Sequence, residues 1–123
     1  MSNFSHNVAA FAQATNSTLD EACRAIKLNL FSGVIMATRV DTGRLRGNWQ
    51  TSIGQPKMDE IDRLDPNGTL ARAEAAETIR GDTVDYLTNN LPYAEVWEEQ
   101  DGMIESNMAR IDRTLREVAN NVS

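Results

Sequence analysis

Apolar or small residues recur at helical spacing over the first third of the chain. Between residues 4 and 37 they come at steps of three and four, which places them on one face of a helix: Phe4, Val8, Phe11, Thr15, Leu19, Ala22, Ile26, Leu30, Val34 and Ala37. Because this register continues through Asn16 without a slip, we predict one long helix over residues 4–38, bent at Asn16 if anywhere.

A competing signal lies within the same stretch. Thr18, followed three residues later by Glu21, has the pattern of a capping box, which favours a second helix that starts at Leu19. An unbroken helix would span roughly 50 Å at ~1.5 Å per residue, which is longer than a small domain needs. If the helix is unbroken, we expect a neighbouring subunit to cover part of its apolar face.

Two short stretches alternate with a period of two, which is typical of strands with one buried face. In the first, Trp49, Thr51 and Ile53 alternate with polar residues until Gly54 and Pro56 end the pattern. The second runs over residues 83–88. We predict a corner and strand over residues 40–54, and an antiparallel partner strand over residues 83–88.

The stretch between the two strands is acidic and contains a strong turn signal. Asp65-Pro66-Asn67-Gly68 predicts a turn, after which Thr69 is expected to cap an alanine-rich helix that Gly81 ends. The apolar side predicted for this helix is thin: Leu70, Ala73, Ala76 and Ile79. We therefore interpret residues 55–82 as a helical insertion between the strands.

The last third is predicted to be helical over residues 92–121. Pro92 suits the start of a short helix, and a final helix follows Gly102. The final helix has an apolar stripe at Ile104, Met108, Ile111, Leu115, Val118 and Val122. The whole pattern predicts a single α+β domain over residues 1–123, in which the first and last helices pack on a small antiparallel sheet.

The most distinctive local pattern is the corner before the first strand. Asp41 and Thr42 can bond their own backbone, and Gly43 tolerates a positive φ, so these residues predict a tight turn. Beyond it, Arg44 and Arg46 are expected on one side of an extended segment, with Leu45 on the other.

The corner is also the first of two blocks that resemble a known family. Val40-Asp41-Thr42-Gly43-Arg44-Leu45-Arg46 with Trp49, and later Asn89-Asn90-Leu91-Pro92-Tyr93-Ala94-Glu95 with Glu98 and Gly102-Met103, are similar in order and spacing to the tail components of tailed bacteriophages. These are small proteins of the neck and tail-completion region, including minor tail components of lambda-like phages. The chain departs from the family at residues 98–101. These residues form a short acidic stretch, whereas the family usually has a glycine-rich loop there.

The net charge is −6 and is divided unevenly: residues 1–56 carry +2, residues 57–85 carry −4, and residues 86–123 carry −4. Such a chain is poorly suited to holding nucleic acid through phosphate contacts, which need clustered Lys and Arg. With a single histidine, His6, and a single cysteine, Cys23, we expect neither a catalytic set nor a metal or cofactor site. No apolar run approaches the length of a membrane span.

The resemblance implies a structural virion protein that is assembled in the host cytoplasm and forms a homo-oligomeric ring in the head–tail connector or tail-completion region. Its expected partners are portal, adaptor or head-closure proteins on one side and tail tube or terminator proteins on the other. DNA would pass through the ring without specific binding. Acidic residues of the insertion are expected to face the channel or a docking surface: Asp59, Glu60, Asp62 and Asp65.

We expect the subunit interface to include residues of the two blocks: Asp41, Arg44, Arg46, Trp49, Tyr93, Glu95 and Glu98. For the arginines, a contact across the subunit boundary and a surface ion pair with Glu95, Glu98 or Glu99 stay equally open. For Trp49, Tyr93 and Trp97, packing in the core is favoured over an interface role. Two other functions stay open, namely a tail terminator that caps the tube, and a nucleic-acid-binding module that uses Arg39, Arg44, Arg46 and the tryptophans.

Overall fold

The computed structural model of the chain describes residues 4–122. Within them lie six helices and a two-stranded antiparallel sheet, which confirms the predicted α+β class. The elements follow in the order α1 (Phe4–Ala14), α2 (Leu19–Ala37), α3 (Arg44–Gly47), β1 (Trp49–Ile53), α4 (Thr69–Thr78), β2 (Asp85–Asn89), α5 (Ala94–Asp101) and α6 (Met103–Val122).

The prediction of one long helix over residues 4–38 is wrong, and the alternative start at Leu19 is confirmed. Asn16 adopts a positive φ of 53° between α1 and α2. Thr18 then caps α2 in a capping box: its Oγ1 accepts from the Glu21 backbone N–H at 3.1 Å, and Glu21 Oε1 accepts from the Thr18 N–H at 2.8 Å. The local capping signal therefore prevails over the continuous apolar register.

The break has a packing reason. It lets α1 turn across the end of α2, so that buried Val8 packs with Ile26 of α2 and Leu115 of α6. A straight helix would have carried Val8 beyond the reach of that cluster. The chain thus covers its own apolar face, and the expected cover by a neighbouring subunit is not needed there.

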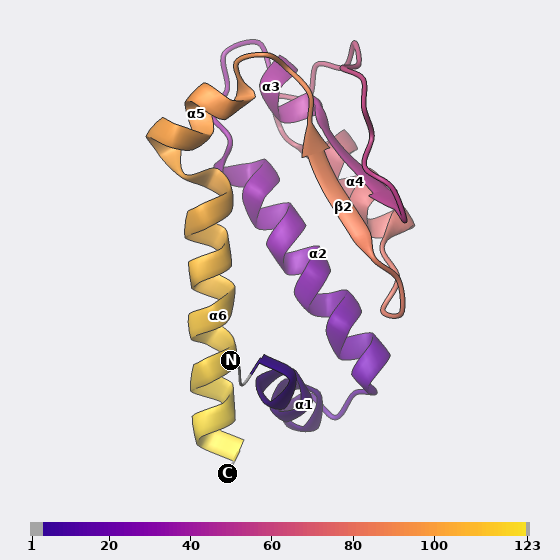
Figure 1. Ribbon diagram of the computed structural model, residues 1–123, viewed down its shortest axis with the longest axis vertical. Helices are drawn as coiled ribbons and strands as arrows, with labels where there is room; N and C mark the ends of the chain where they lie inside the picture. The colour runs from indigo at the N-terminus through magenta and orange to yellow at the C-terminus, as the bar shows by residue number, and fades with distance from the viewer. Residues whose placement is uncertain (1–3, 123) are drawn as a thin grey trace.

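Helix α2 is the centre of the molecule (Figure 1). It runs diagonally between α6, which passes in the opposite direction, and the layer made by the sheet and α4. The main core cluster joins these layers through Val34 and Ile35 of α2, Trp49 of β1, Ala71 of α4 and Met103 of α6.

The two strands pair as predicted, with the second shifted slightly toward the C-terminus. The register runs from Trp49 opposite Asn89 to Ile53 opposite Asp85. Both faces of β1 are buried, although an alternating strand predicts one. The reason is that the segment after β1 folds back over the polar face, where Gln50 Nε2 donates to the Asp59 carbonyl at 2.7 Å.

The outer edge of β1 is covered by two charged side chains. Arg63 donates to the carbonyls of Gly47 and Trp49, both at 2.7 Å, and Glu74 of α4 accepts from the Thr51 N–H at 3.0 Å. Arg63 and Glu74 also form an ion pair at 3.3 Å. Because unpaired strand edges attract other strands, this cover protects one side of the sheet.

Helix α4 is present, but its predicted cap is wrong, and of its predicted apolar face only Ile79 is buried. Gly68, with a φ of 72°, occupies the N-cap position, and Thr69 is already helical. The buried face consists of Ala71 and Ala75 followed by Ile79, while Leu70 is 52% exposed. The small alanines face β1 and α2 because they allow close approach, and this requirement turns Leu70 outward.

The stripe predicted for the last helix is only partly correct. Leu115 is buried, but Ile104 and Met108 are exposed, and Met103 and Asn107 take the inner positions. Helix α6 packs closely against α2 at Gly33, where a Cβ would collide with Asn107 Oδ1. The absence of a side chain at Gly33 therefore sets which face of α6 is buried. Among residues 4–122, no helix has the length and apolar character needed to cross a membrane.

Candidate assembly surface

The predicted corner exists, but it is a helical turn and not an extended segment. Gly43 has a φ of 90° and is the N-cap of α3, whose four residues include Arg44 and Arg46. A Cβ at Gly43 would meet the Pro66 backbone, and the Gly43 carbonyl accepts from the Asp65 N–H at 3.0 Å. The corner is therefore locked against the turn that precedes α4.

Arg46 holds the corner to the end of α2. Its guanidinium donates to the carbonyls of Met36 at 3.0 Å, Thr38 at 2.7 Å and Pro66 at 2.7 Å. The last carbonyls of a helix have no partner within the helix, so a cation there satisfies them. Arg46 thus serves the subunit itself, and its predicted place in an interface has no support from the geometry.

Arg44 forms a surface ion pair, but with a carboxylate that the sequence did not indicate. Its Nη2 lies 2.7 Å from Glu60 Oε1, and both side chains are more than a third exposed. The expected partners Glu95, Glu98 and Glu99 do not contact it. A pair this exposed contributes about 0–1 kcal/mol to stability.

A stronger constellation was missed by the sequence reading. Arg39 forms two hydrogen bonds of 2.8 Å to the carboxylate of Asp101, and its guanidinium lies 3.6 Å from the centre of the Trp97 ring. Hydrogen bonding to Arg39 lowers the pKa of Asp101, and the same bond raises the pKa of Arg39. The contact ties the chain after α2 to the end of α5, and no pattern in the sequence indicates a pair this far apart.

Two grooves lie on either side of α5. The first, the corner groove, has a volume of about 340 Å³ and is lined by Arg39, Val40, Asp41, Thr42, Arg44, Leu45, Tyr93 and Trp97. The second, the edge groove, has a volume of about 330 Å³ and is lined by Trp49, Leu87, Thr88, Asn89, Asn90, Ala94, Glu95, Glu98, Met103 and Ile104.

The fold gathers most of the predicted interface residues at these grooves. Asp41, Arg44 and Tyr93 line the corner groove. Of the other predicted interface residues, all except Arg46 line the edge groove: Trp49, Glu95 and Glu98. The two sequence blocks, separated by some 40 residues, thus meet around α5.

These residues differ in how exposed they are and in whether they are already bonded within the subunit. Trp49 is 3% exposed, and its Nε1 donates to Thr38 Oγ1 at 2.7 Å, so it packs in the core as favoured. Glu98 accepts from the N–H groups of Ile104 and Glu105 and so caps the start of α6. Tyr93 is 41% exposed, so the favoured core packing is wrong for this residue. Glu95 is exposed and forms no ion pair within residues 4–122.

The acidic residues of the insertion differ in exposure, and one of them is buried. Asp59, Glu60 and Asp62 are exposed. Asp65 is 4% exposed, and its Oδ2 accepts from the backbone N–H of Ala71 at 2.8 Å. The expectation that Asp65 faces a channel or docking surface is wrong, because this carboxylate is turned inward to cap the first turn of α4.

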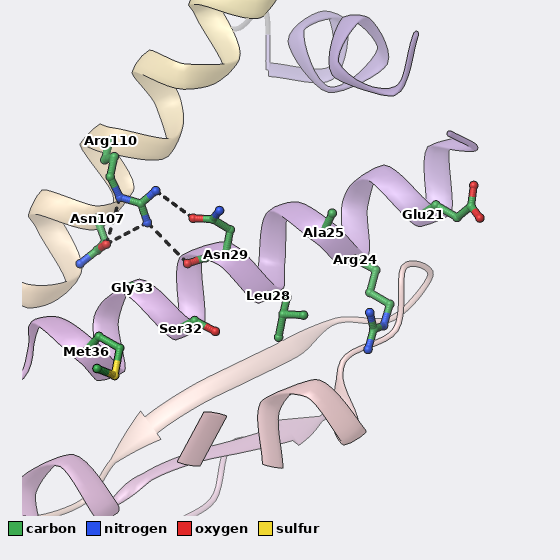
Figure 2. Close-up of a pocket in the computed structure, with 10 residues that line it drawn as sticks. All are labelled: Glu21, Arg24, Ala25, Leu28, Asn29, Ser32, Gly33, Met36, Asn107 and Arg110. Carbon is green, nitrogen blue, oxygen red and sulfur yellow. Dashed lines mark hydrogen bonds between the residues drawn. The ribbon is translucent and has the colours of Figure 1, made fainter. Parts of the chain in front are cut away.

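A third groove, about 660 Å³, runs along α2 beside α6 (Figure 2). Its ionisable side chains are held by other parts of the fold. Glu21 belongs to the capping box, Arg24 donates to the carbonyls of Ala76 and Ile79, and Arg110 bonds Asn29 and Asn107. The groove is open and was not indicated by the sequence.

Within residues 4–122, no three His, Cys, Asp or Glu side chains are grouped so that they could hold a metal ion. Comparisons with protein-family models, with curated proteins and with solved structures find no match to this chain.

Proposed function

We propose that the chain is a structural virion protein of a tailed phage, and that copies of it form a closed ring at the head–tail connection or the tail end. The observation that carries the proposal is the placement of the two grooves. One side of α5 carries Arg39 and Arg44, which are paired with Asp101 and Glu60, together with Asp41, and the other side carries Glu95 and Glu98. Two different surfaces on either side of one subunit suit a head-to-tail contact, in which unlike patches meet and which forms a ring when the rotation closes.

Exposed apolar side chains at the same end of the molecule support an interface there. Val40, Tyr93, Val96 and Ile104 are each more than a third exposed. Apolar and aromatic residues at the centre of a contact supply much of the binding energy, and charged rims set its orientation. In this proposal the function is assembly, with no chemical turnover.

The exposed acidic residues of the insertion suit the channel side. Asp59, Glu60 and Asp62 would repel DNA phosphates at short range, since screening at physiological salt limits the effect to about 8 Å. The genome would then pass without adhering. A position on the tail end, as a terminator of the tube, uses the same ring and the same contacts.

The rival function, binding of nucleic acid, is disfavoured by how its arginines are engaged. Arg39 is paired with Asp101, Arg44 with Glu60, and Arg46 with three backbone carbonyls. Phosphate contacts would have to displace these partners in a chain of net charge −6.

The test is assembly of the purified chain, measured by sedimentation velocity and negative-stain electron microscopy. The expected result is rings with a central opening, and their loss in Arg44→Glu. Arg113→Glu makes the same charge change at an exposed α6 position outside both grooves, and it is expected to leave the rings intact. A wild-type chain that stays monomeric at high concentration and is absent from phage particles would refute the proposal.

A further variant separates the two possible roles of Arg44. Arg44→Glu combined with Glu60→Arg restores the ion pair inside the subunit but leaves the charge at the Arg44 position reversed. Loss of rings in both variants supports a contact across the boundary. Recovery of rings in the double variant would mean that Arg44 acts within its own subunit.

A further inference from the structure

The two edges of the sheet differ in whether their outward main-chain groups have hydrogen-bond partners. Gly54 N–H donates to the Val84 carbonyl at 2.9 Å, and in an antiparallel pair the hydrogen-bonded positions alternate. Gln50 is therefore bonded to Thr88, and the main-chain groups of Leu87 in β2 point away from β1. Two outward groups of β1, the Trp49 carbonyl and the Thr51 N–H, are paired with Arg63 and Glu74.

The edge of β2 has no such cover. Among residues 4–122, no group pairs with the outward N–H and C=O of Leu87 or Asn89, although the Asn89 side chain bonds the Leu45 carbonyl and the Leu91 N–H. A strand edge with free donors and acceptors is a template for another extended chain. The uncovered edge is thus a backbone recognition element.

Three consecutive residues of this edge, Leu87, Thr88 and Asn89, line the edge groove together with residues of α5 and the start of α6. Leu87, Met103 and Ile104 supply apolar lining, and Glu95 and Glu98 supply negative charge. Because α5 and α6 form the opposite wall, the space suits a single extended segment better than the sheet edge of a second folded copy. The unpaired Glu95 favours a basic side chain on that segment.

We propose that the edge groove binds an extended segment of another protein, in which apolar residues alternate with lysine or arginine, as a third strand on β2. Main-chain hydrogen bonds to Leu87 and Asn89 supply affinity, and the side chains that meet Ile104 and Glu95 supply selectivity. The inference deepens the proposed function by naming a kind of partner, and it rests on that function only for where the partner is found.

The test uses the full chain and a capped heptapeptide in which valine and lysine alternate. Hydrogen exchange, followed by NMR, reports on each strand amide. In the free chain we expect fast exchange at Leu87 and Asn89, and slow exchange at Tyr86 and Thr88, whose N–H groups face β1. Bound peptide is expected to slow exchange at Leu87 and Asn89 without changing the other two.

Three controls make the result specific. The same peptide with N-methyl groups on every residue has no N–H to donate from either edge, and we expect it to give no protection. Glu95→Lys is expected to weaken binding about five-fold, the size of one lost surface ion pair. Glu99→Lys, at an exposed position of α5 that does not line the groove, is expected to bind as the wild type does.

Two results would overturn the proposal. One is the absence of protection at Leu87 and Asn89 at saturating peptide. The other is protection of these amides in the peptide-free chain that rises with protein concentration, because a second copy would then occupy the edge. Sedimentation of the same samples distinguishes failure of the ring proposal from failure of the peptide-binding proposal. A chain that binds the peptide but never forms rings refutes only the ring.

Discussion

Removing the Arg63 guanidinium tests how the corner and the sheet are held together. In Arg63→Met the chain keeps a flexible side chain of similar length but loses its bonds to the Gly47 and Trp49 carbonyls and to Glu74. The side chain is 18% exposed, so water replaces these bonds only in part. We expect two poorly solvated carbonyls and an exposed edge on β1.

The size of the effect follows from the lost bonds. A hydrogen bond to a charged group contributes about 1.5–3 kcal/mol, and partial exposure places these two at the lower end. We expect the free energy of unfolding to fall by about 2–4 kcal/mol, a large part of the ~5–15 kcal/mol typical of a domain. With a urea slope of about 2 kcal/mol per molar, the middle of the range typical of small proteins, the midpoint should fall by roughly 1–2 M.

Urea denaturation followed by tryptophan fluorescence measures this change, at a concentration where sedimentation shows one species. Arg113→Met, at an exposed position of α6, is the control and should change stability by no more than about 0.5 kcal/mol. A double-mutant cycle with Glu74→Gln should give a coupling of about 0.5–1.5 kcal/mol. A loss below about 1 kcal/mol in Arg63→Met would show that the strand edge does not depend on this side chain.

Three further predictions concern capping and charge. Thr18→Ala removes the capping box of α2 and should cost about 1 kcal/mol by denaturation, whereas no change would mean that the break at Asn16 holds without it. Asp65→Ala should cost about 1–2 kcal/mol because its inward carboxylate caps α4, and Asp62→Ala should cost under about 0.5 kcal/mol; equal effects would contradict the burial of Asp65. The hydrogen bond from Arg39 lowers the pKa of Asp101 below its ordinary value of 3.8. The ionised Asp101 therefore stabilises the fold above pH 3.8, and this stabilisation is lost as the pH falls through the lower pKa of the folded state. In Asp101→Asn the free energy of unfolding should fall less with acid over this pH range than in the wild type. The same pH dependence in both chains would refute the prediction.

Local signals and long-range packing competed at the first helix. The apolar register ran through Asn16, yet Thr18 and Glu21 satisfied two free backbone groups at once and started a new helix. The register was still informative, because Val8 and Ile26 do share a core cluster after the chain turns. Periodicity indicated which residues are buried, but not that they would meet by folding back.

The candidate site shows the same division. The two sequence blocks marked residues that line the grooves beside α5, including Asp41, Tyr93 and Glu95. Their partners were not indicated: one of the two open alternatives paired Arg44 with the acidic residues of α5, and within the subunit it pairs with Glu60 instead. An ion pair depends on where two side chains end in space, and small rotations of α3 are enough to change it.

The sequence by itself determined the α+β class, the pairing of the two strands and the turn at Gly43, because each depends on spacing or on the conformational freedom of nearby residues. It did not determine which signal would prevail at Asn16, or that the residues after Gly43 form a helical turn. Tertiary structure alone decided which face of α4 and α6 is buried, how Arg63 covers one edge of the sheet, and that the edge at Leu87 stays open. These features depend on the close approach of elements far apart in the chain, such as α6 to Gly33. Local spacing carries no information on that approach.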